Sequence, residues 1–267
     1  MSTLDTLDPK YRLILCDVWG VVHNGVELYP GAAERLGQWR GQGRCVALIT
    51  NAPRTEEAVA KQLGGIGLPL DAYDFIATSG EAGIAALLAV GEPVGFIGTA
   101  GDRAVLEGRG VRISDDDRFT ELACTGIREG EADPEQYRTE LERLVERDVL
   151  MHCLNPDRIV MRGGIAEACA GALADIYQML GGRVTWYGKP FPAIYEHALH
   201  RAGNPPADEV LAVGDGLQTD VLGAARMGFD TVFVTGGINA GEPFPEHFGE
   251  QNGLGDWRPV AVVDSLA

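Results

Sequence analysis

The chain has 267 residues, of which 45% are hydrophobic and 23% are charged, a composition typical of a globular protein with a substantial core. Its formal net charge is −17 at pH 7, and no stretch of the sequence gathers basic residues into a stripe. This charge argues against a nucleic-acid-binding protein, because contacts with backbone phosphates require clustered Lys and Arg.

The first predicted element is a short buried strand that ends in a carboxylate. Leu13-Ile14-Leu15-Cys16 is an apolar run followed by Asp17, and glycines come shortly after it. A run of this length between turn-forming residues is typical of a strand buried on both faces of a parallel sheet. Because open α/β sheets bind ligands beyond the carboxyl ends of their strands, Asp17 is a candidate site residue. Taken alone, Asp17 has the alternative interpretation of a helix N-cap or a turn residue.

The next elements alternate between helices and strands. The sequence predicts a helix over 30–40, a strand over 45–49 that closes on Thr50 and Asn51, a helix from Thr55, a strand over 75–77 and a helix over 81–89. This rhythm predicts a parallel sheet with right-handed crossover connections, so the fold class is α/β.

The middle of the chain, roughly residues 83–184, continues the alternation with elements of its own. The predicted strands cover 94–97, 121–125, 149–154 and 159–161, and the predicted helices cover 102–107, 134–146 and 165–180. We expect this segment to form a second α/β domain inserted into the first. The predicted boundaries are 1–83 and 185–267 for the first domain and 84–184 for the inserted one.

The first sheet is expected to resume at Val184-Thr185-Trp186, which is followed by Lys189. The later elements are a helix over 192–202, a strand over 210–213, a helix that continues through 225, and strands over 231–234 and 260–263. The strand over 210–213 ends in a loop that carries Asp215 and Asp220.

Polar side chains therefore follow the ends of several predicted strands. They are Asp17, Thr50 with Asn51, Lys189, and Asp215 with Asp220. Because the carboxyl ends of parallel strands lie along one edge of a sheet, these residues can converge although they are far apart in sequence. Carboxylate oxygens are the ligands that Mg²⁺ prefers. A lysine with hydroxyl and amide donors suits the oxygens of a phosphoryl group.

This ordered set of motifs resembles the haloacid dehalogenase superfamily. The motifs are LILCDVWGVV, ALITNAPR, GKPFPAIY and VLAVGDGLQTDVLGA. The long insertion, with Asn155-Pro156-Asp157, is similar to the large α/β cap (C2 type) of class IIA, the branch of N-acetylglucosamine-phosphate and p-nitrophenyl phosphatases. The resemblance implies a Rossmann-like parallel-sheet core with an inserted α/β cap domain.

The resemblance also implies a role for each site residue. Asp17 corresponds to the nucleophile that attacks phosphorus and forms an aspartyl-phosphate intermediate. Mg²⁺ would be held by Asp17, the backbone carbonyl of Trp19 and Asp215. Asp220 would orient the metal-bound waters and Lys189, while Lys189, Thr50 and Asn51 would bind the phosphate.

Trp19 is the position at which this sequence departs from the family. The family's phosphatases carry a second aspartate there, two residues after the nucleophile, as general acid and base. An indole donates a hydrogen bond but does not shuttle a proton near neutral pH. We therefore expect metal and phosphate binding to survive and proton transfer to be impaired. His23, in the same loop, is the nearest candidate replacement, and packing on the cap or contact with substrate is the alternative interpretation.

The leading hypothesis is a Mg²⁺-dependent phosphatase of low activity for a small phosphorylated metabolite, such as a sugar phosphate. The alternative is a catalytically weak or inactive protein that binds such a metabolite. Trp19 favours the alternative, whereas retention of the nucleophile, the lysine and both later aspartates favours the phosphatase. Cleavage of a C–Cl or C–P bond is a third hypothesis, and the large α/β insertion argues against it.

The remaining features concern the cellular setting. The five cysteines are widely spaced and form no CxxC pair, which argues against a zinc site and a disulfide framework. No apolar run reaches membrane-spanning length, and the first residues lack the pattern of a signal peptide. We therefore expect a cytoplasmic protein that binds neither nucleic acid nor membrane. A homodimer formed through the cap is a further expectation.

Overall fold

The computed structural model describes residues 3–162, 165–237 and 243–267. Mixed helices and strands form two compact units. The first unit comprises Met1–Thr50, Glu56–Ala77 and Lys189–Ala267, and the second comprises Asn51–Thr55 and Thr78–Gly188. The second unit is therefore inserted into the first at two places, between Thr50 and Glu56 and between Ala77 and Lys189. In the described parts of the chain, no helix is long and apolar enough to cross a membrane.

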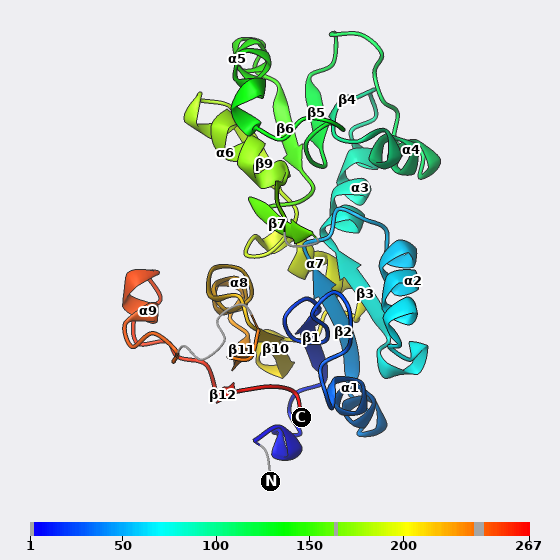
Figure 1. Cartoon of the computed structure of the whole chain (residues 1–267). Coiled ribbons are helices and arrows are strands. Elements are labelled where there is room, and N and C mark those ends of the chain that lie inside the picture. The colour runs from blue at the N-terminus through cyan, green and yellow to red at the C-terminus, as the bar shows by residue number, and fades with distance from the viewer. Residues whose placement is uncertain (1–2, 163–164, 238–242) are drawn as a thin grey trace. The chain divides into compact units, whose positions relative to one another are not determined.

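A six-stranded sheet forms the centre of the first unit, in the order β12-β11-β10-β1-β2-β3 (Figure 1). Its strands are β1 (Leu13–Asp17), β2 (Cys45–Thr50), β3 (Phe75–Thr78), β10 (Val210–Gly214), β11 (Asp230–Val234) and β12 (Ala261–Val263). The central strand β1 pairs in parallel with both β2 and β10. All residues of β1 and β10 are buried, which confirms that their apolar runs are covered on both faces of the sheet.

Helices complete the first unit. They are η1 (Thr3–Thr6), α1 (Ala32–Gly41), α2 (Glu56–Ile66), η2 (Leu70–Ala72), α7 (Pro192–Arg201), η4 (Ala207–Glu209), the π-helix η5 (Leu217–Val221), α8 (Leu222–Arg226) and α9 (Phe248–Gln251). Alternate residues of a strand share one face of a sheet. Leu13 and Leu15 of β1 accordingly pack with Ile194 and Tyr195 of α7 in one buried cluster. This packing fixes α7, and with it the preceding Lys189, against the centre of the sheet.

The second unit contains a four-stranded sheet in the order β4-β5-β6-β9, with parallel pairing throughout. The strands are β4 (Gly95–Ile97), β5 (Glu121–Cys124), β6 (Leu150–Cys153) and β9 (Arg183–Trp186). The helices are α3 (Ser79–Ala89), α4 (Ala100–Gly108), η3 (Pro134–Tyr137), α5 (Arg138–Glu146) and α6 (Ala170–Met179). An antiparallel hairpin of β7 (Ile159–Arg162) and β8 (Ile165–Ala168) stands apart from this sheet.

Two sequence-based predictions are wrong. The segment 184–186 does not resume the first sheet, because β9 pairs with β6 in the second sheet. A local pattern of alternation predicts a strand but does not specify its partner. The predicted helix over 165–180 is also wrong in its first part, since 165–168 is strand β8 and α6 begins at Ala170. Pairing with β7 overrides the helix propensity of an Ala-containing segment.

Candidate active site

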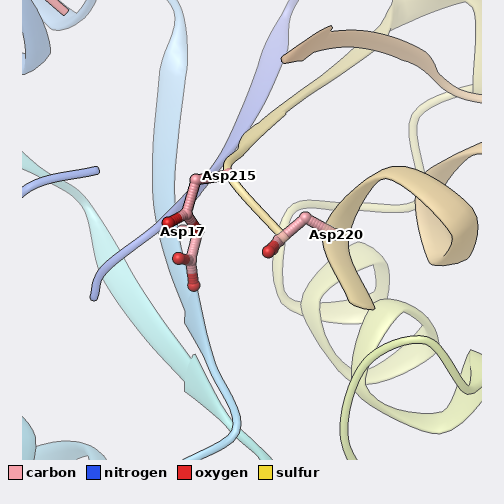
Figure 2. Close-up of side chains that lie close together, drawn as sticks. All are labelled: Asp17, Asp215 and Asp220. Carbon is pink, nitrogen blue, oxygen red and sulfur yellow. The ribbon is translucent and has the colours of Figure 1, made fainter. Parts of the chain in front are cut away.

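Three buried aspartates gather at the carboxyl ends of the central strands. Asp17 is the last residue of β1, Asp215 directly follows β10, and Asp220 lies in η5. Figure 2 shows their side chains turned toward one another, and one oxygen of each lies within 4.8 Å of the others. The exposed fractions of these residues are 5%, 1% and 6%. Such a cluster of buried carboxylates is a candidate site for a metal ion.

Lys189 is the cation that the structure places within this cluster. Its ammonium group donates hydrogen bonds to Oδ1 of Asp17 and, at 2.6 Å, to Oδ1 of Asp220. A longer contact of 3.4 Å joins the same nitrogen to the backbone carbonyl of Ile49. With all three carboxylates ionised, a single ammonium would leave an excess of two negative charges in this buried cluster. That excess of charge is costly to bury, and a divalent cation would offset it.

The pKa values of the cluster reflect its burial and its crowded charges. Burial raises the pKa of Asp17 well above its ordinary value, and the charge of Asp220 raises it further, while Lys189 acts in the opposite direction. Burial alone would lower the pKa of Lys189, but Asp17 and Asp220 outweigh this effect and raise that pKa well above its ordinary value. Lys189 therefore stays charged, and the cluster favours proton or cation uptake.

Asp220 is held by its own loop as well as by Lys189. Its Oδ2 atom accepts hydrogen bonds from the backbone N–H of Gly216, at 3.1 Å, and from the hydroxyl of Thr219, at 3.2 Å. Both oxygens of Asp220 are thus engaged, one by the loop and one by the lysine. This arrangement suits a residue that orients Lys189.

Two glycines enclose the carboxylate of Asp215. A Cβ atom at Gly20 would lie 2.1 Å from Oδ2 of Asp215, and a Cβ atom at Gly237 would lie 1.9 Å from the same oxygen. The backbone can approach the carboxylate this closely only because both residues lack a side chain. Sequence reasoning missed Gly237, because the Gly236-Gly237 pair after β11 signals a turn and gives no indication of its partner.

The loop after β1 holds Trp19 and His23 against each other. The two rings are 5.3 Å apart and nearly perpendicular. His23 is 2% exposed, and its Nδ1 atom accepts a 2.8 Å hydrogen bond from the backbone N–H of Gly25. Burial lowers the pKa of His23, so its ring is neutral near neutral pH. His23 thus packs within its own loop, and its lowered pKa argues against a role as proton carrier, while packing on the cap or contact with substrate stays a prediction.

The predicted phosphate-binding residues of the second motif fall on either side of the boundary between the two units. Thr50 is the last residue of β2, and the register of the sheet places the preceding Ile49 beside Asp17. Asn51 belongs to the second unit, where its amide donates a 2.8 Å hydrogen bond to Asp157. Thr50 thus lies at the same end of the first sheet as the aspartate cluster, as the sequence predicts for a strand terminus.

Known proteins similar to this chain were found by sequence and by structure. A family model for haloacid dehalogenase-like hydrolases matches residues 14–112, and a second, HAD-hydrolase-like model matches residues 186–267. The ribonucleotide monophosphatase NagD of Escherichia coli (strain K12) is 27% identical over 85% of this chain and 88% of that protein. An acid sugar phosphatase of Staphylococcus saprophyticus is 25% identical over 87% of this chain and 90% of that protein. A crystal structure of a haloacid dehalogenase-like hydrolase from Brucella suis 1330 matches with a TM-score of 0.83 and 36% identity, covering 99% of this chain and 98% of that one.

Proposed function

The chain belongs to the haloacid dehalogenase-like hydrolases, and on that premise we propose that it is a Mg²⁺-dependent phosphoric monoester hydrolase for small phosphorylated metabolites. The observation that carries this proposal is the buried cluster in which Lys189 joins Asp17 and Asp220 while Asp215 lies alongside. Two of the matched relatives bear the names of phosphatases, one for ribonucleotides and one for sugar phosphates.

The donor set fits a magnesium ion. Its oxygens are hard ligands, and its negative charge exceeds what Lys189 can offset. Asp17, the backbone carbonyl of Trp19 and Asp215 are the proposed ligands, and Asp220 is the proposed orienting residue. Bound Mg²⁺ would reduce the repulsion between the carboxylates and the phosphate oxygens and stabilise the charge of the transferred phosphoryl group.

Asp17 is the proposed nucleophile. An oxygen of its carboxylate forms a bond to phosphorus, the bond between phosphorus and the ester oxygen breaks, and the leaving oxygen departs with the electron pair. Lys189, Thr50 and Asn51 are the proposed partners of the phosphate oxygens. Water then attacks the aspartyl phosphate, releases inorganic phosphate and restores Asp17.

Proton transfer is the weak step of this scheme. The leaving oxygen needs a proton, and Trp19 has none to exchange near neutral pH. His23 is neutral, and its Nδ1 atom already accepts a hydrogen bond from the backbone N–H of Gly25. General acid–base assistance is worth about 10²- to 10⁴-fold in rate. We therefore propose slow turnover, limited by the stability of the departing oxyanion.

The inserted unit is the proposed cap domain. Its main segment, Thr78–Gly188, begins at the last residue of β3, and the chain returns to the first unit at Lys189. By family resemblance this unit would select the substrate and exclude water from the reaction. A homodimer formed through it stays a prediction.

Hydrolysis of p-nitrophenyl phosphate with and without Mg²⁺ tests the proposed function. We expect slow release of nitrophenolate that requires Mg²⁺ and disappears in an Asp17→Asn variant that still folds. Activity that survives in Asp17→Asn would exclude the proposed nucleophile.

A second candidate function is the binding of a phosphorylated metabolite without turnover. Trp19, at the position of the missing aspartate, favours it. Calorimetry with inorganic phosphate and Mg²⁺ distinguishes the two functions. Tight binding without detectable hydrolysis of any phosphate ester would favour the binding protein.

A further inference from the structure

We propose that Trp19 is a specificity-determining residue that stacks on a flat aromatic ring in the leaving group of the substrate. The inference rests on the proposed function, since it concerns phosphate monoesters that reach Asp17. Preferred substrates would carry an aromatic or heteroaromatic ring a few bonds from the ester oxygen. A nucleoside 5′-monophosphate has this chemistry, and a simple sugar phosphate does not.

Trp19 is both exposed and held in place, which is an unusual combination. It is 42% exposed although it is large and apolar. Its six-membered ring lies close to Gly25, where an added Cβ atom would be 2.3 Å from Cη2 of Trp19. His23 packs nearly perpendicular to the same indole and can cover at most one of its faces. A fixed ring with open surface is suited to stacking, because little side-chain freedom remains to be lost on binding.

The backbone of Trp19 lies close to the aspartate cluster. Asp17 precedes it by two residues, so the two Cα atoms are at most about 7 Å apart. Gly20 follows it directly, and its backbone is so near Asp215 that a Cβ atom at Gly20 would lie 2.1 Å from Oδ2 of Asp215. The side chain of Trp19 therefore starts between Asp17, which belongs to the cluster, and Gly20, whose backbone closely approaches Asp215. A ring attached to the transferred phosphate through a short linker would lie within reach of it.

The alternative role of Trp19 is that of an apolar cover, which would exclude water without regard to the leaving group. The two roles differ in what they discriminate. A cover acts equally on all phosphate monoesters, whereas a stacking platform acts only on those that carry a ring. When an aromatic side chain on which a base stacks is substituted, binding weakens by about 5- to 150-fold.

Adenosine 5′-monophosphate and ribose 5-phosphate form the matched pair for the test. Both release a primary sugar hydroxyl, so their leaving oxygens have similar basicity, and only one carries an aromatic ring. We expect the protein to favour the nucleotide by about 5- to 150-fold in kcat/KM, mainly through KM. Trp19→Leu keeps apolar bulk and should lose this preference, while Trp19→Phe should retain part of it. Val26→Ala, at an 84% exposed residue of the same loop, is the control and should keep the preference.

Binding of the same two ligands to an Asp17→Asn variant separates this inference from the proposed function. If hydrolysis fails but calorimetry still shows a nucleotide preference that Trp19→Leu removes, the stacking role stands and the hydrolase does not. If both esters are hydrolysed equally well, or if Trp19→Leu affects both to the same degree, the stacking role is wrong and the hydrolase stands. Absence of both hydrolysis and a binding preference would overturn the two together.

Discussion

The backbone of Gly237 lies so close to Asp215 that a Cβ atom at this glycine would be 1.9 Å from the carboxylate oxygen Oδ2. The same Cβ atom would also lie 2.6 Å from Cγ of Asp215 and 2.6 Å from the backbone carbonyl oxygen of Gly20. A residue that belongs to none of the recognised motifs thus restricts the position of the proposed metal ligand.

Gly237→Ala should therefore displace the carboxylate of Asp215 and weaken Mg²⁺ binding. We expect a loss of about 10- to 100-fold in affinity, as is usual when a residue that positions a metal ligand is changed. Isothermal titration calorimetry measures it. Gly64→Ala in α2 is the matched control, since a Cβ atom there meets nothing within 4 Å. Equal Mg²⁺ affinity of the two variants would show that Gly237 does not restrict Asp215.

Asp215→Asn should weaken Mg²⁺ binding more than Gly237→Ala does. The substitution removes a charged oxygen ligand rather than shifting it, and Mg²⁺ strongly prefers carboxylate oxygens to amides. Calorimetry at constant ionic strength gives the affinity directly. An unchanged dissociation constant in Asp215→Asn would exclude this residue from the metal site.

Asp17→Asn should stabilise the metal-free protein at neutral pH. The folded-state pKa of Asp17 is raised by burial and by Asp220, so ionisation of this carboxyl destabilises the fold above its ordinary pKa. The effect is absent when the group is protonated in both states and grows as the pH rises toward the folded-state pKa. Asparagine does not ionise and so removes this destabilisation. A gain of about 1 kcal/mol in the free energy of unfolding would raise Tm by about 2–4 °C.

Thermal unfolding of the native chain and of Asp17→Asn, recorded from acidic to neutral pH, checks whether the substitution stabilises the metal-free protein. The difference in Tm should be largest near neutrality and should shrink toward acidic pH. Added Mg²⁺ should raise the Tm of the native chain and have little effect on the variant. A lower Tm for metal-free Asp17→Asn at neutral pH would show that the ion pair with Lys189 outweighs the cost of burial.

Hydrolysis should be faster for phosphate esters with acidic leaving groups. An aryl oxyanion departs without a proton, whereas an alkoxide requires one, and neither the indole of Trp19 nor the neutral ring of His23 is an effective proton donor. Rates for a series of aryl and alkyl phosphates, plotted against leaving-group pKa, should fall steeply. A flat plot would indicate that another residue, with His23 as the first candidate, donates the proton.

The chemistry of the cluster could be predicted from the sequence because it depends on strand ends. Asp17 and Asp215 each follow an apolar run, and adjacent parallel strands bring such positions together. Lys189 also reaches the cluster, although the strand before it, β9, belongs to the other sheet. Its position comes instead from the packing of α7 on the central strands.

The remaining features depend on contacts between distant segments, which a local pattern does not encode. The approach of Gly237 to Asp215 joins residues at the ends of two different strands. The strand conformation of β8 likewise depends on a contact with another segment, its pairing with β7. The packing of Trp19 near His23 and Gly25 could not be predicted either, because it depends on the folded conformation of the loop.

The most direct measurement compares kcat/KM for ribose 5-phosphate in the native protein, Trp19→Asp and Trp19→Ala. This ester has no aromatic ring and a poor leaving group, so it depends most on a general acid. Trp19→Asp should raise kcat/KM because it supplies a general acid, which is worth about 10² to 10⁴ in rate. The gain should be smaller than this, because the smaller side chain also leaves a void at the site. Trp19→Ala opens the same space without a proton carrier and should give no such gain. An equal gain in both variants, or none in Trp19→Asp while Mg²⁺ and phosphate still bind, would contradict a hydrolase that lacks only its general acid.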